Sequence, residues 1–173
     1  TVERVLTEEG FPKLPRRLGL RLGITVKGAS VPARSETLAL PALDGKRFDS
    51  DCAGVFLFAP FLAQMDFRRV VQDAGLPGSK AIPALSYVLS FLALKLLGNE
   101  RYAHVGEHGF DPGLGLFAGL NTLPKCTAMS TYSFGLDEVH IERLQKAFVR
   151  RATSLGLYGG PIVNLDFHTV PHF

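Results

Sequence analysis

The chain has 173 residues, of which 46% are hydrophobic and 20% charged, and this composition excludes wholesale disorder. Its net charge of +3 permits nucleic acid as a partner without requiring one. The two cysteines, Cys52 and Cys126, are too few and too far apart for a disulfide framework, which favours a reducing, cytoplasmic location.

Residues 1–44 are rich in Pro, Gly and basic side chains, and we predict an extended arm or linker there. Apolar residues alternate from Leu18 to Val26, which predicts a strand with Arg21 on its opposite face. This basic segment is either a solvated hairpin or an arm that lies on DNA phosphates.

Residues 45–158 are predicted to form a helical domain. The first helix is expected over about 60–74. The second is expected from Ser79, as its cap, through Pro83 in the first turn to Gly98 at the end. It is apolar almost all round, which predicts a central position, and its apolar run is shorter than the ~20 residues of a membrane span.

Three short helices are expected next, over 101–108, 111–120 and 124–134. The third is entered through a Leu-Pro-Lys turn and is rich in hydroxyl groups, which is typical of the second helix of a helix-turn-helix. Its polar side chains are therefore candidates for contact with double-stranded DNA: Lys125, Thr127, Ser130 and Thr131.

A long amphipathic helix is predicted over 138–155, with Asp137 as its cap. One of its stripes is apolar, and the opposite stripe carries Arg143, Lys146 and Arg150. This basic stripe is either a solvated helix face or a second contact with DNA phosphates.

Residues 162–170 predict a strand after the break at 159–161. Apolar and polar residues alternate along it, so that Asp166 shares the polar face with His168. A carboxylate held rigidly in this way is either a satisfied structural group or a ligand for metal-assisted phosphoryl chemistry.

Two of these segments resemble one known family. The strand sequence NLDFHTVPH, at 164–172, resembles the first strand of the RNase H-like catalytic domain in DDE transposases of bacterial insertion sequences. The sequence GLGLFAGLNTLPKCTAMSTYS, at 113–133, resembles the region "glxLFAGLxxLPKxTxLSxYS" that precedes this domain in the same family. The two motifs agree in order and spacing, and the resemblance covers about residues 48–173.

The resemblance implies that Asp166 is the first of three metal-binding carboxylates. In the complete protein these would hold Mg²⁺ or Mn²⁺ for cleavage and strand transfer at transposon ends, with a homodimer acting on nucleoid DNA. No Asp or Glu follows Asp166 in this chain, so the other two carboxylates are expected further along the reading frame. The chain alone is expected to bind no metal and to be inactive.

The expected fold class is therefore mainly α with minor β. A helical, helix-turn-helix-like DNA-handling domain over 45–158 would be followed at 159–173 by the first strand of a truncated RNase H-like domain. The alternatives are a stand-alone helix-turn-helix module without catalysis and a structural helical domain without a nucleic-acid partner.

A competing metal site is suggested by His104-Val105-Gly106-Glu107-His108, which fits the H-x-x-E-H pattern of inverted zinc peptidases. Two histidines four residues apart on a helix can share one zinc ion. Gly106 and Gly109 weaken that helix, however, and nothing nearby nominates a third ligand. A plain surface helix is the favoured interpretation.

Overall fold

The computed structural model describes three stretches of the chain, namely residues 34–39, 49–99 and 101–158. The strands predicted over 18–26 and 162–170 lie outside them. The chain divides into two units, Thr1–Val31 and Pro32–Phe173, and every described residue belongs to the second unit.

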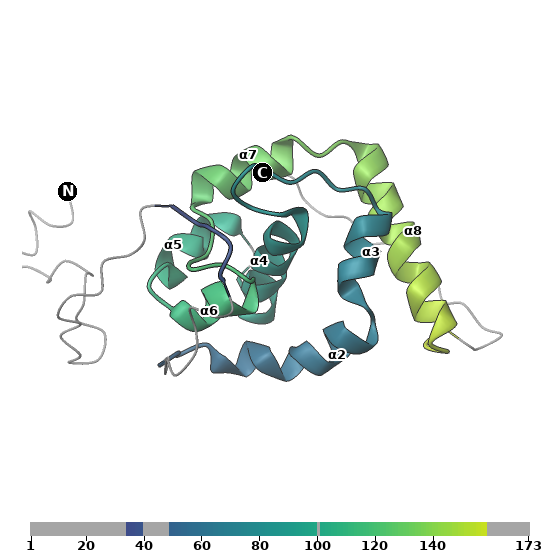
Figure 1. The fold of residues 1–173 in the computed structure, drawn as a ribbon, viewed down its shortest axis with the longest axis horizontal. Helices are drawn as coiled ribbons and strands as arrows, with labels where there is room; N and C mark the ends of the chain where they lie inside the picture. The colour runs from purple at the N-terminus through teal and green to yellow at the C-terminus, as the bar shows by residue number, and fades with distance from the viewer. Residues whose placement is uncertain (1–33, 40–48, 100, 159–173) are drawn as a thin grey trace, which may run out of the picture. The chain divides into compact units, whose positions relative to one another are not determined.

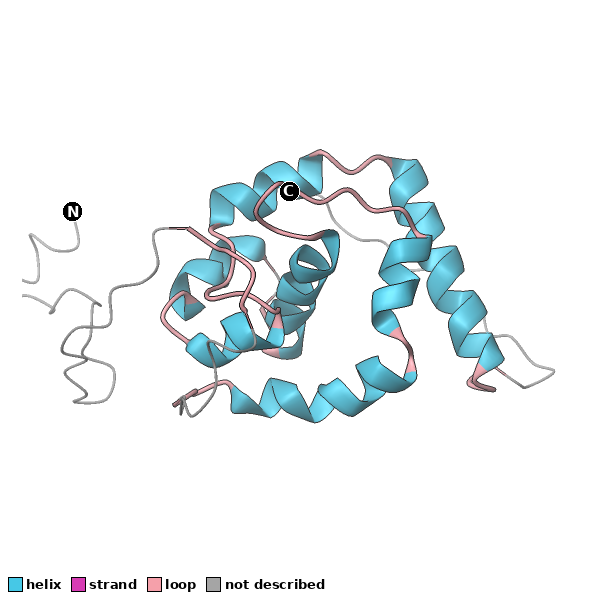
Figure 2. Cartoon of the chain, viewed as in Figure 1, coloured by secondary structure: helices cyan, strands magenta, loops and turns pink. Residues whose placement is uncertain are grey.

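The described residues are mainly helical, which confirms the predicted class (Figure 2). Two 3₁₀ helices and seven α-helices follow one another in these stretches: η2 (Ala53–Phe58), α2 (Ala59–Gln64), α3 (Phe67–Asp73), α4 (Ala84–Leu96), η3 (Tyr102–His104), α5 (Val105–His108), α6 (Pro112–Phe117), α7 (Cys126–Phe134) and α8 (Glu138–Ser154). Among the described residues, pairing of the β type is confined to one antiparallel bridge between Thr37 and Leu120.

Helix α4 lies at the centre of the described helices, as its all-round apolar surface predicted (Figure 1). On one side, Tyr87 and Leu94 belong to the larger apolar cluster, which also contains buried side chains of α6 and α7. On the other side, Leu85 and Val88 pack against a smaller cluster around Val71 at the end of α3. Burial on both sides explains why this helix has no polar stripe.

The prediction that Ser79 caps α4 is wrong. The helix begins at Ala84 with Pro83 in the cap position. Ile82 precedes a proline, and the proline ring disfavours a helical conformation at the residue before it. The Ser79 hydroxyl instead accepts a hydrogen bond from the Ile82 N–H at 2.9 Å and closes a turn. At the other end, Gly98 adopts a φ of 75° and ends the helix as predicted.

The single helix predicted over 60–74 is also wrong, because it is two helices separated at Asp66. This residue has φ 47° and ψ 51°, a left-handed conformation that Asp tolerates better than most side chains. The break lets α3 turn away from α2 and pack against α8 (Figure 1). The carbonyls left free at the end of α2 accept hydrogen bonds from the Arg151 guanidinium, at 2.8 Å for Gln64 and 3.0 Å for Met65.

Helix α6 begins as predicted, with Asp111 as its cap and Pro112 in its first turn. The Asp111 carboxylate accepts hydrogen bonds from the backbone N–H groups of Gly113, at 2.8 Å, and Leu114, at 3.2 Å. It also accepts one from the Ser50 hydroxyl at 2.8 Å, so the same side chain ties the start of η2 to α6.

A short segment at 35–38, within the predicted arm, lies along the loop after α6. The Leu38 N–H donates to the Gly119 carbonyl at 3.1 Å, and the Ser35 hydroxyl donates to the Leu123 carbonyl at 2.9 Å. These bonds tie the loop that leads into the Leu-Pro-Lys turn to the 35–38 segment.

Candidate nucleic-acid interface

Helix α7 has one inward-facing anchor and a polar outer face. Met129 is fully buried, whereas Thr127 and Thr131, one helical turn apart, are exposed. In the turn before the helix, Leu123 and Pro124 are buried and Lys125 is exposed. The turn is therefore anchored by its apolar pair, and Lys125 stays on the surface.

The fourth predicted contact residue, Ser130, lies differently. It is half-buried, and its oxygen accepts a hydrogen bond from the Tyr102 hydroxyl at 3.4 Å. The structure thus places Lys125, Thr127 and Thr131 at the exposed side of α7 and turns Ser130 towards η3. A role in positioning α7 fits Ser130 better than a direct contact.

The N-terminal end of α7 has no side-chain cap. Lys125 occupies the cap position and makes no capping hydrogen bond, and the first turn contains no acidic residue. Free backbone N–H groups at a helix start carry the positive end of the helix dipole, which attracts phosphate. Lys125 adds a full positive charge at the same end.

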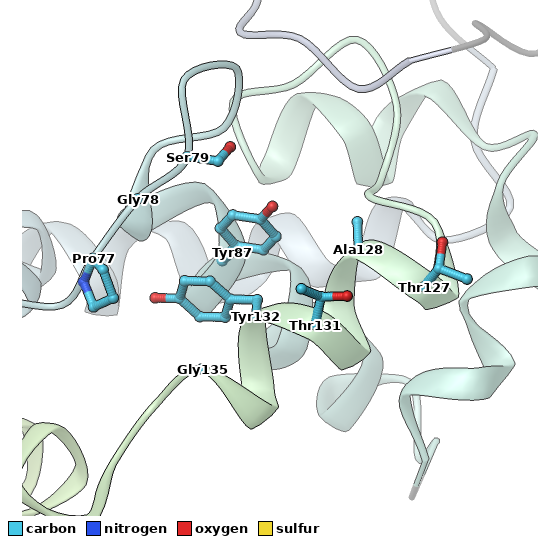
Figure 3. A pocket seen from close by; sticks show the side chains of 9 residues that line it. All are labelled: Pro77, Gly78, Ser79, Tyr87, Thr127, Ala128, Thr131, Tyr132 and Gly135. Atoms are coloured by element: carbon cyan, nitrogen blue, oxygen red, sulfur yellow. The ribbon is translucent and has the colours of Figure 1, made fainter.

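A groove of about 460 Å³ runs beside α7 (Figure 3). Its lining comes from α7, from Tyr87 of α4 and from the turn before α4: Pro77, Gly78, Ser79, Tyr87, Thr127, Ala128, Thr131, Tyr132 and Gly135. The rings of Tyr87 and Tyr132 stack with their centroids 4.0 Å apart and an angle of 9° between their planes. The predicted residues Thr127 and Thr131 therefore border an aromatic groove that no local sequence pattern indicated.

The Tyr132 hydroxyl is buried and has no hydrogen-bond partner among the described atoms. Burial, and then the neighbouring Tyr87, raise the pKa of Tyr132 to about 12. The hydroxyl therefore keeps its proton at neutral pH and remains an unused donor. An unpaired donor of this kind destabilises a folded chain by about 1–3 kcal/mol.

Replacing Tyr132 by Phe is expected to raise the free energy of unfolding by about 1 kcal/mol, because it removes the unpaired hydroxyl and keeps the ring stack. Urea denaturation followed by circular dichroism measures the change. A loss of stability instead would mean that the hydroxyl has a partner in solution.

The basic stripe of α8 is exposed, but carboxylates lie close to it. The Lys146 ammonium donates to Glu142 at 2.6 Å, and this contact, with a smaller effect of Arg143, lowers the pKa of Glu142. Arg150 lines a small hollow that also contains Asp66, Arg69, Asp73 and Arg151. The charge of Lys146 is therefore partly compensated by Glu142, whereas the start of α7 has no acidic residue in its first turn.

The H-x-x-E-H segment is divided between η3 and α5, and both of its histidines make polar contacts with Asn99. Nδ1 of His104 lies 3.2 Å from Oδ1 of Asn99, and Nε2 of His108 lies 2.8 Å from Nδ2 of the same Asn99. Over the described stretches, no three His, Cys, Asp or Glu side chains come close enough together to hold a metal ion.

Cys52 lies beside this histidine pair, with its sulfur 3.9 Å from Nδ1 of His108. Burial, followed by the negative charge of Asp111, raises the pKa of the Cys52 thiol to about 11. The thiol is therefore protonated at neutral pH, and the Cys52–His108 pair is not an activated nucleophile.

Cys52 is expected to react with iodoacetamide at pH 8 on the order of tenfold more slowly than an unperturbed thiol, because so little thiolate is present. Mass spectrometry of the Cys126→Ser variant isolates this one site. Replacing Asp111 by Asn removes a nearby negative charge and should speed the reaction. Alkylation of Cys52 as fast as that of a free small thiol would contradict the assignment.

The predicted catalytic and metal-binding residue, Asp166, lies outside the described residues. Nowhere in the described stretches is a helix both long and apolar enough to cross a membrane. No protein-family model, curated protein or solved structure matches this chain.

Proposed function

We propose that this chain is the helical, DNA-contacting region of a DDE transposase and that α7, with Lys125 at its start, meets duplex DNA at the transposon ends. The observation that carries the proposal is the division of the 113–133 motif into an inner and an outer set of side chains. The apolar members are buried: Leu114, Phe117, Leu120, Leu123 and Met129. Core packing accounts for these residues but not for the polar residues left outside.

The exposed threonines of α7 disfavour the helix that carries them, and this cost to folding supports a role for them in binding. Thr disfavours an α-helix by about 0.5 kcal/mol relative to Ala, and α7 keeps Thr127 and Thr131 at exposed positions. Hydroxyl and methyl groups of Thr suit the base edges and thymine methyls of the major groove. A helix entering that groove contacts bases through its N-terminal residues, which here include Thr127.

The arrangement differs in one respect from a simple helix-turn-helix. Residues 118–125 connect α6 to α7, and this connection is longer than the usual turn of about three or four residues. Gly119, with a φ of 72°, and the hydrogen bonds to the 35–38 segment order it. In this proposal α7 is the DNA-contacting helix, and the longer connection before it is held by hydrogen bonds. The basic stripe of α8 adds contacts with phosphates alone.

The catalytic part of the proposal rests on the resemblance around Asp166. In the complete protein, working as a homodimer on nucleoid DNA in the cytoplasm, Asp166 would be one of three carboxylates for Mg²⁺ or Mn²⁺. Bound metal would activate the attacking oxygen and stabilise the leaving oxygen in phosphodiester cleavage. This chain alone supplies the first carboxylate only, and we expect it to bind DNA without cutting it.

Replacing Lys125 by Ala is expected to weaken duplex binding about equally on every sequence, because one phosphate contact is lost. The slope of the logarithm of the binding constant against the logarithm of the salt concentration should become shallower by about 1. Replacing Thr131 by Val should instead change sequence preference by about 1–3 kcal/mol at one position. Fluorescence anisotropy of labelled duplexes at several salt concentrations measures both effects.

Arg68 provides the matched control for this experiment. It is exposed on α3, and its replacement by Ala removes the same charge away from α7. The Arg68→Ala slope should stay closer to that of the unmodified chain. A Lys125→Ala slope equal to that of the unmodified chain would show that α7 does not meet the DNA backbone.

A further inference from the structure

One asparagine connects the two histidines of the H-x-x-E-H segment to the end of α4. Asn99 follows α4, and its backbone N–H donates to the Leu94 carbonyl at 2.9 Å. Its side-chain oxygen lies 3.2 Å from Nδ1 of His104, and its side-chain nitrogen lies 2.8 Å from Nε2 of His108. All three side chains are half-buried. The asparagine therefore fastens η3 and α5 to the last turn of α4.

The side-chain amide of Asn99 limits how many protons the two histidines can carry. An amide has one oxygen that accepts hydrogen bonds and one NH₂ group that donates them. The NH₂ group can bond only to a ring nitrogen without a proton, so His108, which it faces, is neutral. His104 can be neutral or charged, because its Nδ1–H donates to the amide oxygen in either state. Turning the amide over exchanges the two roles and again requires one neutral histidine.

A second proton breaks this arrangement. When both rings are charged, all of their nitrogens carry hydrogens, and one ring then meets the NH₂ group of Asn99 with a second donor. A hydrogen bond is replaced by a contact between two donors. Histidine is the side chain whose charge ordinarily changes between about pH 5 and 8, so mild acid is enough to supply the second proton. The bonded arrangement is therefore favoured at neutral pH and is lost as the pH falls.

The other titratable groups around this pair are of kinds that keep their charge in mild acid. Carboxyl, thiol, phenol and ammonium groups ordinarily titrate outside the range of about pH 5–7.5. Burial raises the pKa of the Cys52 thiol, whose sulfur lies 3.9 Å from Nδ1 of His108, to about 11. Within the described stretches, neither histidine forms an ion pair. The neighbouring elements carry Lys95 on α4, Tyr102 on η3, Glu107 on α5, Asp111 before α6, and Cys126 and Tyr132 on α7.

We propose that Asn99, His104 and His108 form a proton-sensitive latch, which is closed while at least one histidine is neutral and opens when both are charged. Opening releases η3 and α5 from the end of α4. Because η3 carries Tyr102, whose hydroxyl donates to Ser130 of α7 at 3.4 Å, the latch connects acidity to the position of α7. The proposal does not depend on DNA binding, and its test contains no DNA.

Amide hydrogen exchange of the full chain, followed by NMR at pH 7.5 and 5.0, tests the latch. Protection is the intrinsic exchange rate at each pH divided by the measured rate. At the amides of His104, Val105 and Asp111, which all donate to backbone carbonyls, protection should fall about tenfold in acid. His104→Gln and His108→Gln should each keep it at pH 5.0, because the latch stays closed with one charged histidine. Asn99→Ala should have low protection at both pH values.

His140 provides the matched control. It is also half-buried, but it lies on α8, where its ring closes the capping box with Asp137, and Gln suits the same position. His140→Gln should lose protection at 104–111 in acid as the unmodified chain does.

The proposal is overturned if the unmodified chain keeps its protection at pH 5.0, or if neither His104→Gln nor His108→Gln retains it. It is also overturned if His140→Gln retains protection in acid, or if Asn99→Ala is as protected at pH 7.5 as the unmodified chain.

Discussion

Replacing Met129 by Ala is expected to lower the free energy of unfolding by about 2–5 kcal/mol. Met129 is 0% exposed and is the only buried residue of α7. Most other residues of α7 are Thr, Ser and aromatic types, which favour helices weakly. The helix therefore depends on this anchor, and urea denaturation followed by circular dichroism should show a single, earlier transition.

Phe134 lies on the same helix and is 84% exposed, so Phe134→Ala tests the anchor against a large side chain that is not packed. Phe134→Ala should change the free energy of unfolding by no more than about 0.5 kcal/mol. Equal losses for the two variants would contradict the inward orientation of Met129, and with it the assignment of the opposite side of α7 to DNA.

Replacing Gly115 by Ala is expected to destabilise the chain by about 3 kcal/mol, which is large for one methyl group. A Cβ atom at Gly115 would lie 2.9 Å from the Leu120 carbonyl oxygen, 2.9 Å from Cα of Thr122 and 3.0 Å from the Asn121 carbonyl carbon. All three are backbone atoms, so α6 or the loop before α7 has to move. The same denaturation experiment measures the loss.

Gly106, on α5, is the control for this substitution because a Cβ atom there meets nothing within 4 Å. Gly106→Ala should leave stability unchanged or raise it by up to about 1 kcal/mol, since Ala favours a helix more than Gly. If Gly115→Ala proved as stable as the unmodified chain, the loop of residues 120–122 would not be packed on α6.

The sequence predicted best those features that depend on neighbouring residues. Asp111 and Asp137 cap α6 and α8 as expected, and Gly98 ends α4, because these signals act within one helical turn. The break at Asp66 was missed because it serves packing of α3 against α8, far along the sequence. The start of α4 could have been placed correctly by giving more weight to the residue before Pro83.

In the candidate site, too, features that depend on neighbouring residues were predicted and those that depend on distant residues were not. Its exposed residues lie within one short segment and were predicted from it, whereas the direction of Ser130 depends on Tyr102, which is 28 residues away. The residues that share a hollow with Arg150 include Asp66 and Asp73, which are far from it in the sequence. The groove also needed the structure, because Tyr87 and Tyr132 stack across two helices without any pattern that links them in the sequence.

The most direct test of DNA contact by α7 is a ¹⁵N amide NMR titration with a short duplex at low salt. We expect shifts that are largest from Lys125 to Thr131, together with the turn at 77–79 across the groove, and that recede as salt is added. No shift at low salt, or shifts confined to α2 and α3, would contradict the central claim and leave a helical domain with some other partner.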